Sequence, residues 1–360
     1  MKNILCAALL SCAAGTAIAD NSNVVLYGLI DMGYSWRGDN RNANVSSRQG
    51  IDGGQANGSR IGFKGEEGLG NGLKALFTLE AGILADTGGA AQGGLAWGRQ
   101  SFVGLDKEGI GAITLGRQYT PVDTLWGDID PFSTGSVGRA DNIITPLIAY
   151  GRADNAVLLS TPFFGRLFAM KAMYSTNLVG AETAGDTGNT RYANVVPRVK
   201  LLDDRLELGL SWSQWKRQQS PSKNEMWDLS AIARLPFATL STAYSRFDNG
   251  ALPDGSARLV NGESLKLDRY FAGAKIPVDR LTIMTSYAYS KDRNGADLKA
   301  QQLALGGRYA FSTRTSVYTM FSRILADDRT SATCGYDVTD ATTLGMGYRT
   351  GLNIGVTHVF

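Results

Sequence analysis

Apolar and polar residues alternate with a period of two along much of this chain, and that alternation limits what it can fold into. Successive side chains of a β-strand point to opposite faces, so an alternating segment has one apolar and one polar side. The last nine residues show the pattern, which only Val359 breaks. Their apolar face carries Leu352, Ile354, Val356, His358 and Phe360. Because the termini of soluble domains usually fray into water, so apolar a terminal strand favours a wall between lipid and water.

Repetition makes this weak local signal strong, because about sixteen segments carry it in succession. Residues 24–36, 60–66, 73–80 and 206–213 are clear examples. The two faces are less distinct between Thr315 and Arg323, where both carry apolar residues. After the first nineteen residues no apolar run of about 18 residues occurs, so no transmembrane helix is expected.

The predicted connections alternate between short and long. Short ones, rich in the Gly, Pro and Asp of tight turns, are 67–72, 106–111, 162–166, 202–205, 236–238, 277–280 and 312–314. Long ones are 37–58, 84–94, 121–151, 176–190, 248–263 and 325–340. Short turns on one side and long loops on the other are typical of transmembrane barrels of the outer membrane. A closed sheet also removes the edges that an open sheet or sandwich would expose. The sequence therefore predicts an all-β protein, an antiparallel barrel with short periplasmic turns and long extracellular loops.

The first nineteen residues predict export. A short positive segment, Met1-Lys2-Asn3, precedes an apolar stretch over 4–14, and Ala17-Ile18-Ala19 is a typical cleavage site. The apolar stretch is too short to span a bilayer, and a faint lipoprotein pattern at 9–12 is the alternative interpretation. Removal of 1–19 leaves residues 20–360 as a single domain whose one cysteine, Cys334, cannot form an internal disulfide.

Composition excludes some partners and supports the barrel. The formal net charge is only +3, so nucleic-acid binding has no electrostatic support. The chain has 44 glycines, 9 prolines and 33 aromatic residues (14 Tyr, 13 Phe and 6 Trp), which fits many strands joined by tight turns.

Several segments resemble one family. They are Val24-Val25-Leu26-Tyr27-Gly28, residues 59–75, residues 98–105, residues 111–118, Tyr150-Gly151-Arg152-Ala153-Asp154-Asn155 and residues 355–360. Together they are similar to the general diffusion porins of Gram-negative bacteria, and most of all to the porin branch of β-proteobacteria. The resemblance implies a sixteen-stranded barrel, a homotrimer in outer-membrane lipid and lipopolysaccharide, and a water-filled channel for small hydrophilic solutes and ions. No cofactor is implied.

The resemblance also points to a basic wall in the channel. By the parity of each strand, Arg60, Lys64 and Lys74 fall on polar faces, as does Arg99, and Arg152 begins the strand after the longest loop. In similar porins the arginines matching Arg60, Arg99 and Arg152 line one side of the constriction. Lys64, Lys74 and Arg117 are further candidates for this wall. The alternative is that these are solvated or ion-paired lumen residues with no role in selection.

The loop 121–151 is the candidate for the opposite, acidic side. It carries Asp123, Asp128, Asp130 and Asp141 against Arg139. In the family the third long loop folds into the barrel, and residues 128–135 resemble its acidic tip. Acidic groups facing basic ones set a transverse field, and rings of charge set ion preference. A mild preference for anions is expected, although Leu29 stands where some porins have a basic residue. An ordinary solvated loop is the alternative.

Other functions fit less well. The only histidine, His358, lies near the chain end on the apolar face, so a nucleophile or a zinc site has no partner and an enzyme is not expected. A substrate-selective channel and a surface adhesin or antigen without transport remain open. The final strand, with Leu352, Ile354, Val356, His358 and Phe360, resembles the signal that the barrel-insertion machinery reads.

Overall fold

The computed structural model describes residues 20–40, 47–133, 135–143, 151–182, 188–218, 223–248, 259–260, 263–334, 336, 338 and 347–360. The predicted leader, 1–19, lies outside the described residues, as do 134 and 144–150 of the predicted constriction loop.

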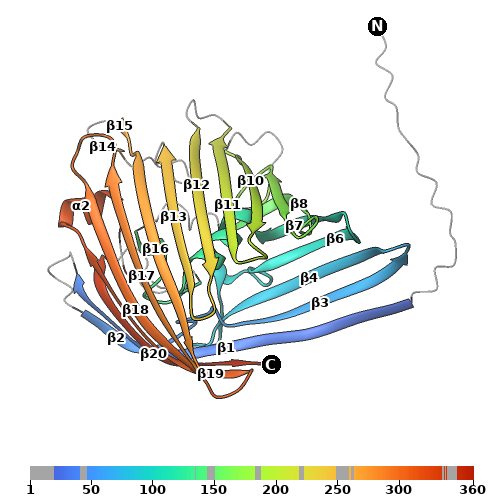
Figure 1. The fold of residues 1–360 in the computed structure, drawn as a ribbon, viewed down its shortest axis with the longest axis horizontal. Coiled ribbons are helices and arrows are strands. Elements are labelled where there is room, and N and C mark those ends of the chain that lie inside the picture. The colour runs from blue at the N-terminus through green and yellow to red at the C-terminus, as the bar shows by residue number, and fades with distance from the viewer. Residues whose placement is uncertain are drawn as a thin grey trace, which may run out of the picture.

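Most of the residues that the structure describes form strands (Figure 1). They are β1 (Asp20–Asn40), β2 (Ser47–Gly53), β3 (Arg60–Gly70), β4 (Leu73–Leu84), β5 (Gly89–Ala90), β6 (Gln100–Lys107), β7 (Gly111–Tyr119), β8 (Arg152–Ser160), β9 (Phe168–Ser175), β10 (Thr190–Leu201), β11 (Leu206–Arg217), β12 (Asn224–Arg234), β13 (Thr239–Asp248), β14 (Leu259–Val260), β15 (Glu263–Ser264), β16 (Leu267–Val278), β17 (Leu281–Asp292), β18 (Lys299–Ala310), β19 (Thr315–Leu325) and β20 (Tyr348–Val359). In the described parts of the loops lie two α-helices and two 3₁₀ turns: η1 (Gln92–Gly94), α1 (Pro121–Ile129), η2 (Ala140–Asn142) and α2 (Asp328–Cys334).

One antiparallel sheet of 18 strand segments closes on itself. The first segment, β1, pairs with β20 from Leu29↔Val359 to Asn40↔Tyr348, so the sheet has no open edge there. Along its other side β1 pairs first with β3 and then with β2, which together act as one split strand. The short β5 is a flap on the end of β4. The wall therefore has sixteen strands, which confirms the predicted fold class.

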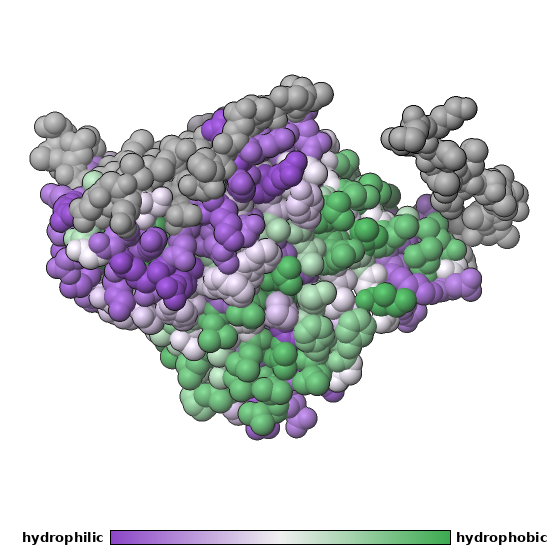
Figure 2. Space-filling view, turned by 90° about the horizontal axis from the view of Figure 1, so that it is seen from above, coloured by the Kyte–Doolittle hydropathy of each residue, from purple (hydrophilic) through white to green (hydrophobic). Residues whose placement is uncertain are grey.

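The outer surface is apolar in the middle of the wall (Figure 2). Residues such as Val103, Leu229 and Leu305 are more than half exposed on it. On the last strand, Ile354 and Phe360 are exposed while Asn353 is buried inside, as the alternation predicts. No helix among the described residues is both long and apolar enough to cross a membrane.

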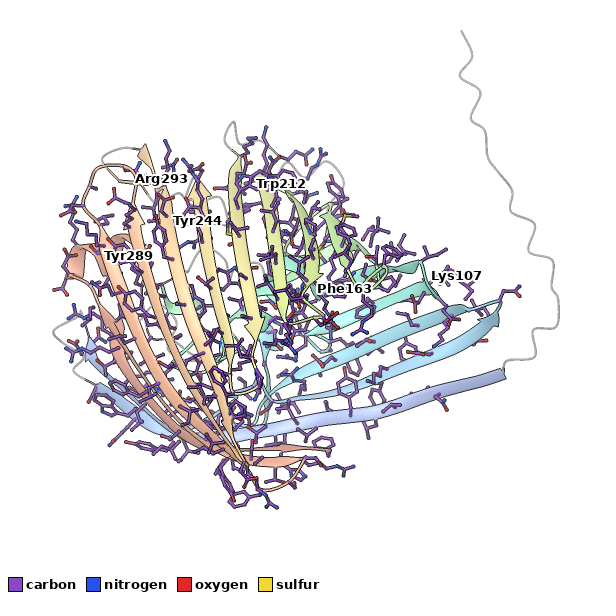
Figure 3. The ribbon with its side chains drawn as sticks, in the orientation of Figure 1. Lys107, Phe163, Trp212, Tyr244, Tyr289 and Arg293 are labelled. Carbon is purple, nitrogen blue, oxygen red and sulfur yellow. The ribbon has the colours of Figure 1, made fainter. Side chains whose placement is uncertain are left out.

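Aromatic side chains form a belt on the loop side of the outer wall (Figure 3). Tyr270 lies between two neighbours, with ring centroids 5.3 Å from Tyr244 and 6.2 Å from Tyr289. Trp212 and Trp227 are paired at 6.3 Å on adjacent strands. Amphipathic rings of this kind are typical of the membrane–water interface.

Strand ends depart from the prediction on the loop side. The first strand continues to Asn40, and β2 lies inside the predicted loop 37–58. Likewise β5 and η1 occupy part of 84–94, β14 part of 248–263, and α2 part of 325–340. The reason is chemical. Beyond the apolar layer, the outer face of a strand no longer needs to be apolar. Such a strand can carry polar residues on its inner face, such as Arg48, which pairs with Asp52 at 2.6 Å. Alternation then no longer marks the strand.

The third long loop folds into the barrel, as predicted for its described residues. Its apolar side chains Leu125, Trp126, Ile129 and Phe132 are buried against the inner wall. Trp126 packs edge-on against Phe271 of β16 at 5.7 Å. The strands beneath it make room with glycines, since a Cβ at Gly209 would lie 2.9 Å from the Leu125 side chain, and one at Gly273 or Gly306 would meet Pro131 or Phe132.

The last long loop also packs inward. Tyr336 and Val338 are buried, and Tyr336 hydrogen-bonds Ser290 of β17. Packed apolar side chains of these loops therefore fill part of the lumen. This explains why the strands there carry apolar residues on both faces, as the sequence shows around Thr315–Arg323.

Candidate functional site

A cavity of about 480 Å³ lies beside the inward loop, against the loop-side ends of β3, β7 and β8. Three of the predicted basic residues line it, Arg60, Arg99 and Arg152. Arg60 and Arg152 are the first residues of their strands and Arg99 immediately precedes β6, so all three enter the wall from the loop side. This shared level brings together residues that are far apart in the sequence.

The loop contributes the rest of the charged lining. Arg139 adds a fourth guanidinium, and Asp123 and Asp141 are the two carboxylates that line the same cavity. The described part of the lining therefore carries four cations and two acidic groups. Both Arg139 and Asp141 were recognised in the sequence as loop charges but not as site residues.

Arg99 is held by a buried ion pair. Its Nε donates to Glu80 Oε1 at 2.7 Å, and the two side chains are 7% and 3% exposed. The Tyr27 hydroxyl donates to the other Glu80 oxygen at 3.0 Å. Arg60 instead donates its Nε to the Gly58 carbonyl at 3.0 Å, a neutral acceptor. The charge of Arg99 is thus partly compensated, whereas that of Arg60 has no anionic partner at hydrogen-bonding distance among its described contacts.

Both acidic groups bind protons near neutral pH. Asp123 lies in the first turn of α1, whose N-cap Thr120 accepts the Asp123 backbone N–H. Burial raises the pKa of Asp123 to about 6, against the attraction of Arg152 and Arg99, which lowers it. Burial raises the pKa of Asp141 to about 7, while Arg139 lowers it and the nearby Asp130 raises it further.

The other predicted acidic residues lie elsewhere. Asp128 pairs with Arg198 of β10 at 2.8 Å. Asp130 is fully buried and accepts the backbone N–H groups of Phe132 at 3.0 Å and Ala140 at 2.9 Å. Its carboxylate therefore ties the loop to itself, and Asp130 is not among the residues that line the cavity. Sequence alone does not distinguish an acidic residue that caps its own loop from one that lines a pore.

The remaining predicted basic residues are also outside the cavity. Arg117 pairs with Asp154 and donates to the Gly98 carbonyl at 2.7 Å. Lys64 and Lys74 line a second hollow of about 580 Å³, together with apolar residues such as Phe102. Lys74 is 3.2 Å from Glu66. The structure thus separates the six predicted basic residues into three that share the cavity and three that do not.

Tyr119 is a lining residue that the sequence did not reveal. It is the last residue of β7 and pairs in register with Arg152, the first of β8. Its hydroxyl accepts hydrogen bonds from Arg99 and from Arg152. Its place immediately before the long loop, opposite an arginine immediately after it, is the only signal that could have found it.

Comparison with known proteins agrees with this geometry. A family model described as Gram-negative porin matches residues 6–330. An outer membrane porin protein of Bordetella pertussis is 31% identical over 358 residues, covering 88% of this chain and 92% of its own. Among solved structures, the anion-selective porin from Comamonas acidovorans has a TM-score of 0.74 and 25% identity, covering 94% of this chain and 100% of its own. The trimer form of OmpT from Vibrio cholerae has a TM-score of 0.67 and 16% identity, covering 95% and 100%. The chain belongs to the family of Gram-negative porins, which are diffusion channels of the outer membrane.

Proposed function

We propose that this porin prefers anions and that the cavity lined by Arg60, Arg99 and Arg152 sets the preference. One observation carries the proposal: these three arginines and Arg139 lie around one cavity with only two carboxylates, Asp123 and Asp141. Charges act on a permeating ion within about a Debye length, ~10 Å at 0.1 M salt. Because the formal net charge of the whole chain is only +3, the preference depends on this local excess. The anion-selective porin of similar fold supports the same assignment.

The opposing charges produce an electric field across the cavity in addition to its excess of positive charge. Arg60, Arg99 and Arg152 belong to the barrel wall, whereas Asp123 and Asp141 belong to the loop. A polar solute passing between them meets a transverse field and can align its dipole with it. Lys64 and Lys74, on the same face of β3 and β4, extend the positive wall beyond the cavity. Arg117, Asp128 and Asp130 act through their contacts within the protein.

The proposal includes the assembly. The channel works as a homotrimer in outer-membrane lipid and lipopolysaccharide, as in the similar porin solved as a trimer. The barrel-insertion machinery reads the final strand, whose outward residues Ile354 and Phe360 are exposed. Residues 1–19 form the cleaved leader and residues 20–360 the barrel domain, with 121–151 as the constriction loop.

The test is the reversal potential of the purified protein in a planar bilayer under a KCl gradient. Replacing Arg60, Arg99 and Arg152 together with glutamine should shift it toward cation selectivity, and Asp123→Asn should shift it toward anions. Arg166→Gln is a matched control, because Arg166 lies in an exposed turn, 82% exposed, and pairs with Asp204. Intact trimers with an unchanged reversal potential in both variants would place the selective region elsewhere. A barrel that conducts no ions would favour an adhesin.

A further inference from the structure

Tyr119 lies at the neck of the constriction loop, where the chain leaves the barrel wall and returns to it. The neck is closed by two contacts: Thr120 N–H donates to the Gly151 carbonyl at 3.2 Å, and Tyr119 pairs in register with Arg152. The side chain of Tyr119 lines the arginine cavity. A residue in this place can couple the position of the loop to the position of the arginines.

Two guanidinium groups converge on this one side chain. Arg152 Nη2 donates to the Tyr119 hydroxyl oxygen at 2.7 Å, and Arg99 Nη2 donates to the same oxygen. Both cations also lie over the ring, with Arg152 Cζ 4.4 Å and Arg99 Cζ 5.8 Å from its centroid. A phenol oxygen has two acceptor sites, so it can accept both hydrogen bonds, and an aromatic face attracts cations.

This arrangement counters a repulsion. Two like charges held this close repel one another, and without a shared acceptor their flexible side chains would move apart. Glu80 holds Arg99 from the other side through Nε, but the Arg152 side chain has no carboxylate among its described hydrogen-bond partners. Tyr119 is therefore the contact that keeps Arg152 beside Arg99.

The pair leaves donors directed at the cavity. A Cβ built on Gly58 would lie only 2.8 Å from Arg99 Nη1, so this nitrogen occupies space that a side chain at position 58 would take. Gly58 itself lines the cavity. With Nε bound to Glu80 and Nη2 to Tyr119, the third nitrogen of Arg99 is the one that an ion can meet.

We infer that Tyr119 is a positioning residue of the anion-selective cavity: through its hydroxyl and its ring it holds Arg99 and Arg152 as an adjacent pair. The inference rests on the proposed function, since it explains how two of the selecting cations are kept in place. Tyr119 touches no permeating ion in this account. It acts through the two arginines.

The experiment compares Tyr119→Phe and Tyr119→Leu with the wild-type trimer in a planar bilayer. The phenylalanine keeps the ring and loses the acceptor oxygen, whereas the leucine loses both. Arg152→Gln is the reference for loss of one charge, and Tyr287→Phe is the control. Tyr287 is 40% exposed on the outer wall, and its hydroxyl bonds to Gln301.

The first measurement is the anion-to-cation permeability ratio in a KCl gradient. Arg152→Gln should lower it about threefold, the effect of losing one screened charge about 7 Å from the ion path. Tyr119→Leu should lower it by less, because both arginines are displaced but keep their charge. Tyr119→Phe should fall between the leucine variant and the wild type, and Tyr287→Phe should match the wild type. This order of permeability ratios is expected if the ring and the hydroxyl oxygen of Tyr119 each contribute to holding the arginines.

The second measurement is block of the chloride current by inorganic phosphate, which binds best where two guanidinium groups stand side by side. Its half-blocking concentration should rise in Tyr119→Leu, even though every arginine is still present. The heat stability of the trimer is recorded in parallel, because a merely structural role would lower stability and leave ratio and block unchanged.

The outcomes separate the two levels of the proposal. If the wild type shows no anion preference, or Arg152→Gln leaves the ratio unchanged, the proposed function itself fails. If Arg152→Gln lowers the ratio but both Tyr119 variants keep the wild-type ratio and phosphate block, the inference about Tyr119 is overturned and the proposed function stands. Should the leucine variant fail to assemble, the phenylalanine variant decides by the same criteria.

Discussion

Acidification should strengthen the anion preference of this porin between pH 8 and pH 5. The groups responsible are Asp123 and Asp141, whose pKa values burial raises to about 6 and about 7. An acid loses its negative charge as the pH falls through its pKa, so both residues are anionic at pH 8 and neutral at pH 5. The four arginines of the cavity stay charged throughout. The local net charge therefore becomes more positive on acidification.

The size of the effect follows from the charges. Asp123 goes from about 99% to about 9% ionised between pH 8 and pH 5, and Asp141 from about 90% to about 1%. One charge about 7 Å from the ion path acts with about 0.6 kcal/mol in water, which screening at 0.1 M salt roughly halves. Two lost charges thus favour an anion by about 0.6 kcal/mol and disfavour a cation equally. The permeability ratio should rise about sevenfold, because 1.36 kcal/mol corresponds to a factor of ten.

The assay is the reversal potential at a fixed KCl gradient, stepped from pH 8 to pH 5. The range stops at 5 because ordinary carboxylates titrate near pH 4. The only histidine, His358, is exposed on the final strand and does not line the cavity. Asp123→Asn combined with Asp141→Asn should hold the ratio at its acid value at every pH. A wild-type ratio that stays flat or falls on acidification would refute the reasoning, as would an unaltered pH response in the double variant.

Three further predictions concern the loop, the cavity and assembly. Trp126→Ala should destabilise the packing of the inward loop by about 3–5 kcal/mol and raise the single-channel conductance. The reason is that Trp126 is 3% exposed and donates a hydrogen bond to Asp228 at 3.3 Å. The control Trp97→Ala, at a side chain 36% exposed, should leave the conductance unchanged. Gly58→Ala should lower the anion-to-cation ratio, because the new methyl displaces Arg99 Nη1; an unchanged ratio would show that the nitrogen has room to move. Deleting Phe360 should reduce the amount of the porin in the outer membrane while its export continues. The deletion removes the terminal aromatic ring and both backbone hydrogen bonds between Phe360 and Gly28, at 3.0 and 3.1 Å. A normal amount in the outer membrane would argue against a role of Phe360 in assembly.

The wall could be predicted from the sequence, but the filling of the lumen could not. Alternation reports which side chains meet lipid, and outward residues such as Leu229 and Leu305 follow it closely. It says nothing about what covers the inner face. Where the loop packs, inward positions such as Gly273 and Gly306 are small, because a Cβ there would meet Pro131 or Phe132 instead of water. That contact joins segments more than a hundred residues apart and leaves no periodic trace.

The candidate site, like the fold, could be predicted from the sequence only in part. Arg60, Arg99 and Arg152 were predicted through their resemblance to porin arginines, and each begins or immediately precedes a strand, so the ladder fixes its level. The contacts of Asp130 could not be predicted, because a carboxylate that caps its own loop and one that faces water have the same sequence signature. Tyr119 was missed because its role comes from two arginines reaching it from different strands. Local pattern therefore predicts where a residue stands on the wall, and only the fold shows which residues share a cavity.

Two of the arginines that line the cavity, Arg99 and Arg152, should differ in how much stability their loss costs, and the difference can be measured. Arg152 donates a hydrogen bond to a neutral hydroxyl, so Arg152→Gln removes a charge and leaves no buried carboxylate without its partner. Arg99 is bonded to Glu80, which is 3% exposed, so Arg99→Gln leaves a buried carboxylate with the Tyr27 hydroxyl as its remaining described partner. Breaking one side of a buried pair costs about 3–5 kcal/mol.

Heat denaturation of the folded barrel should therefore show a clear loss for Arg99→Gln and little for Arg152→Gln. Combining Arg99→Gln with Glu80→Gln should restore most of the stability, because the uncompensated charge disappears together with its partner. The double variant should still prefer anions less than the wild type, because Arg99 lines the cavity and Glu80 does not. Equal stability of the two single arginine variants would contradict this account, because it would mean that Glu80 finds solvent or another cation once Arg99 is gone.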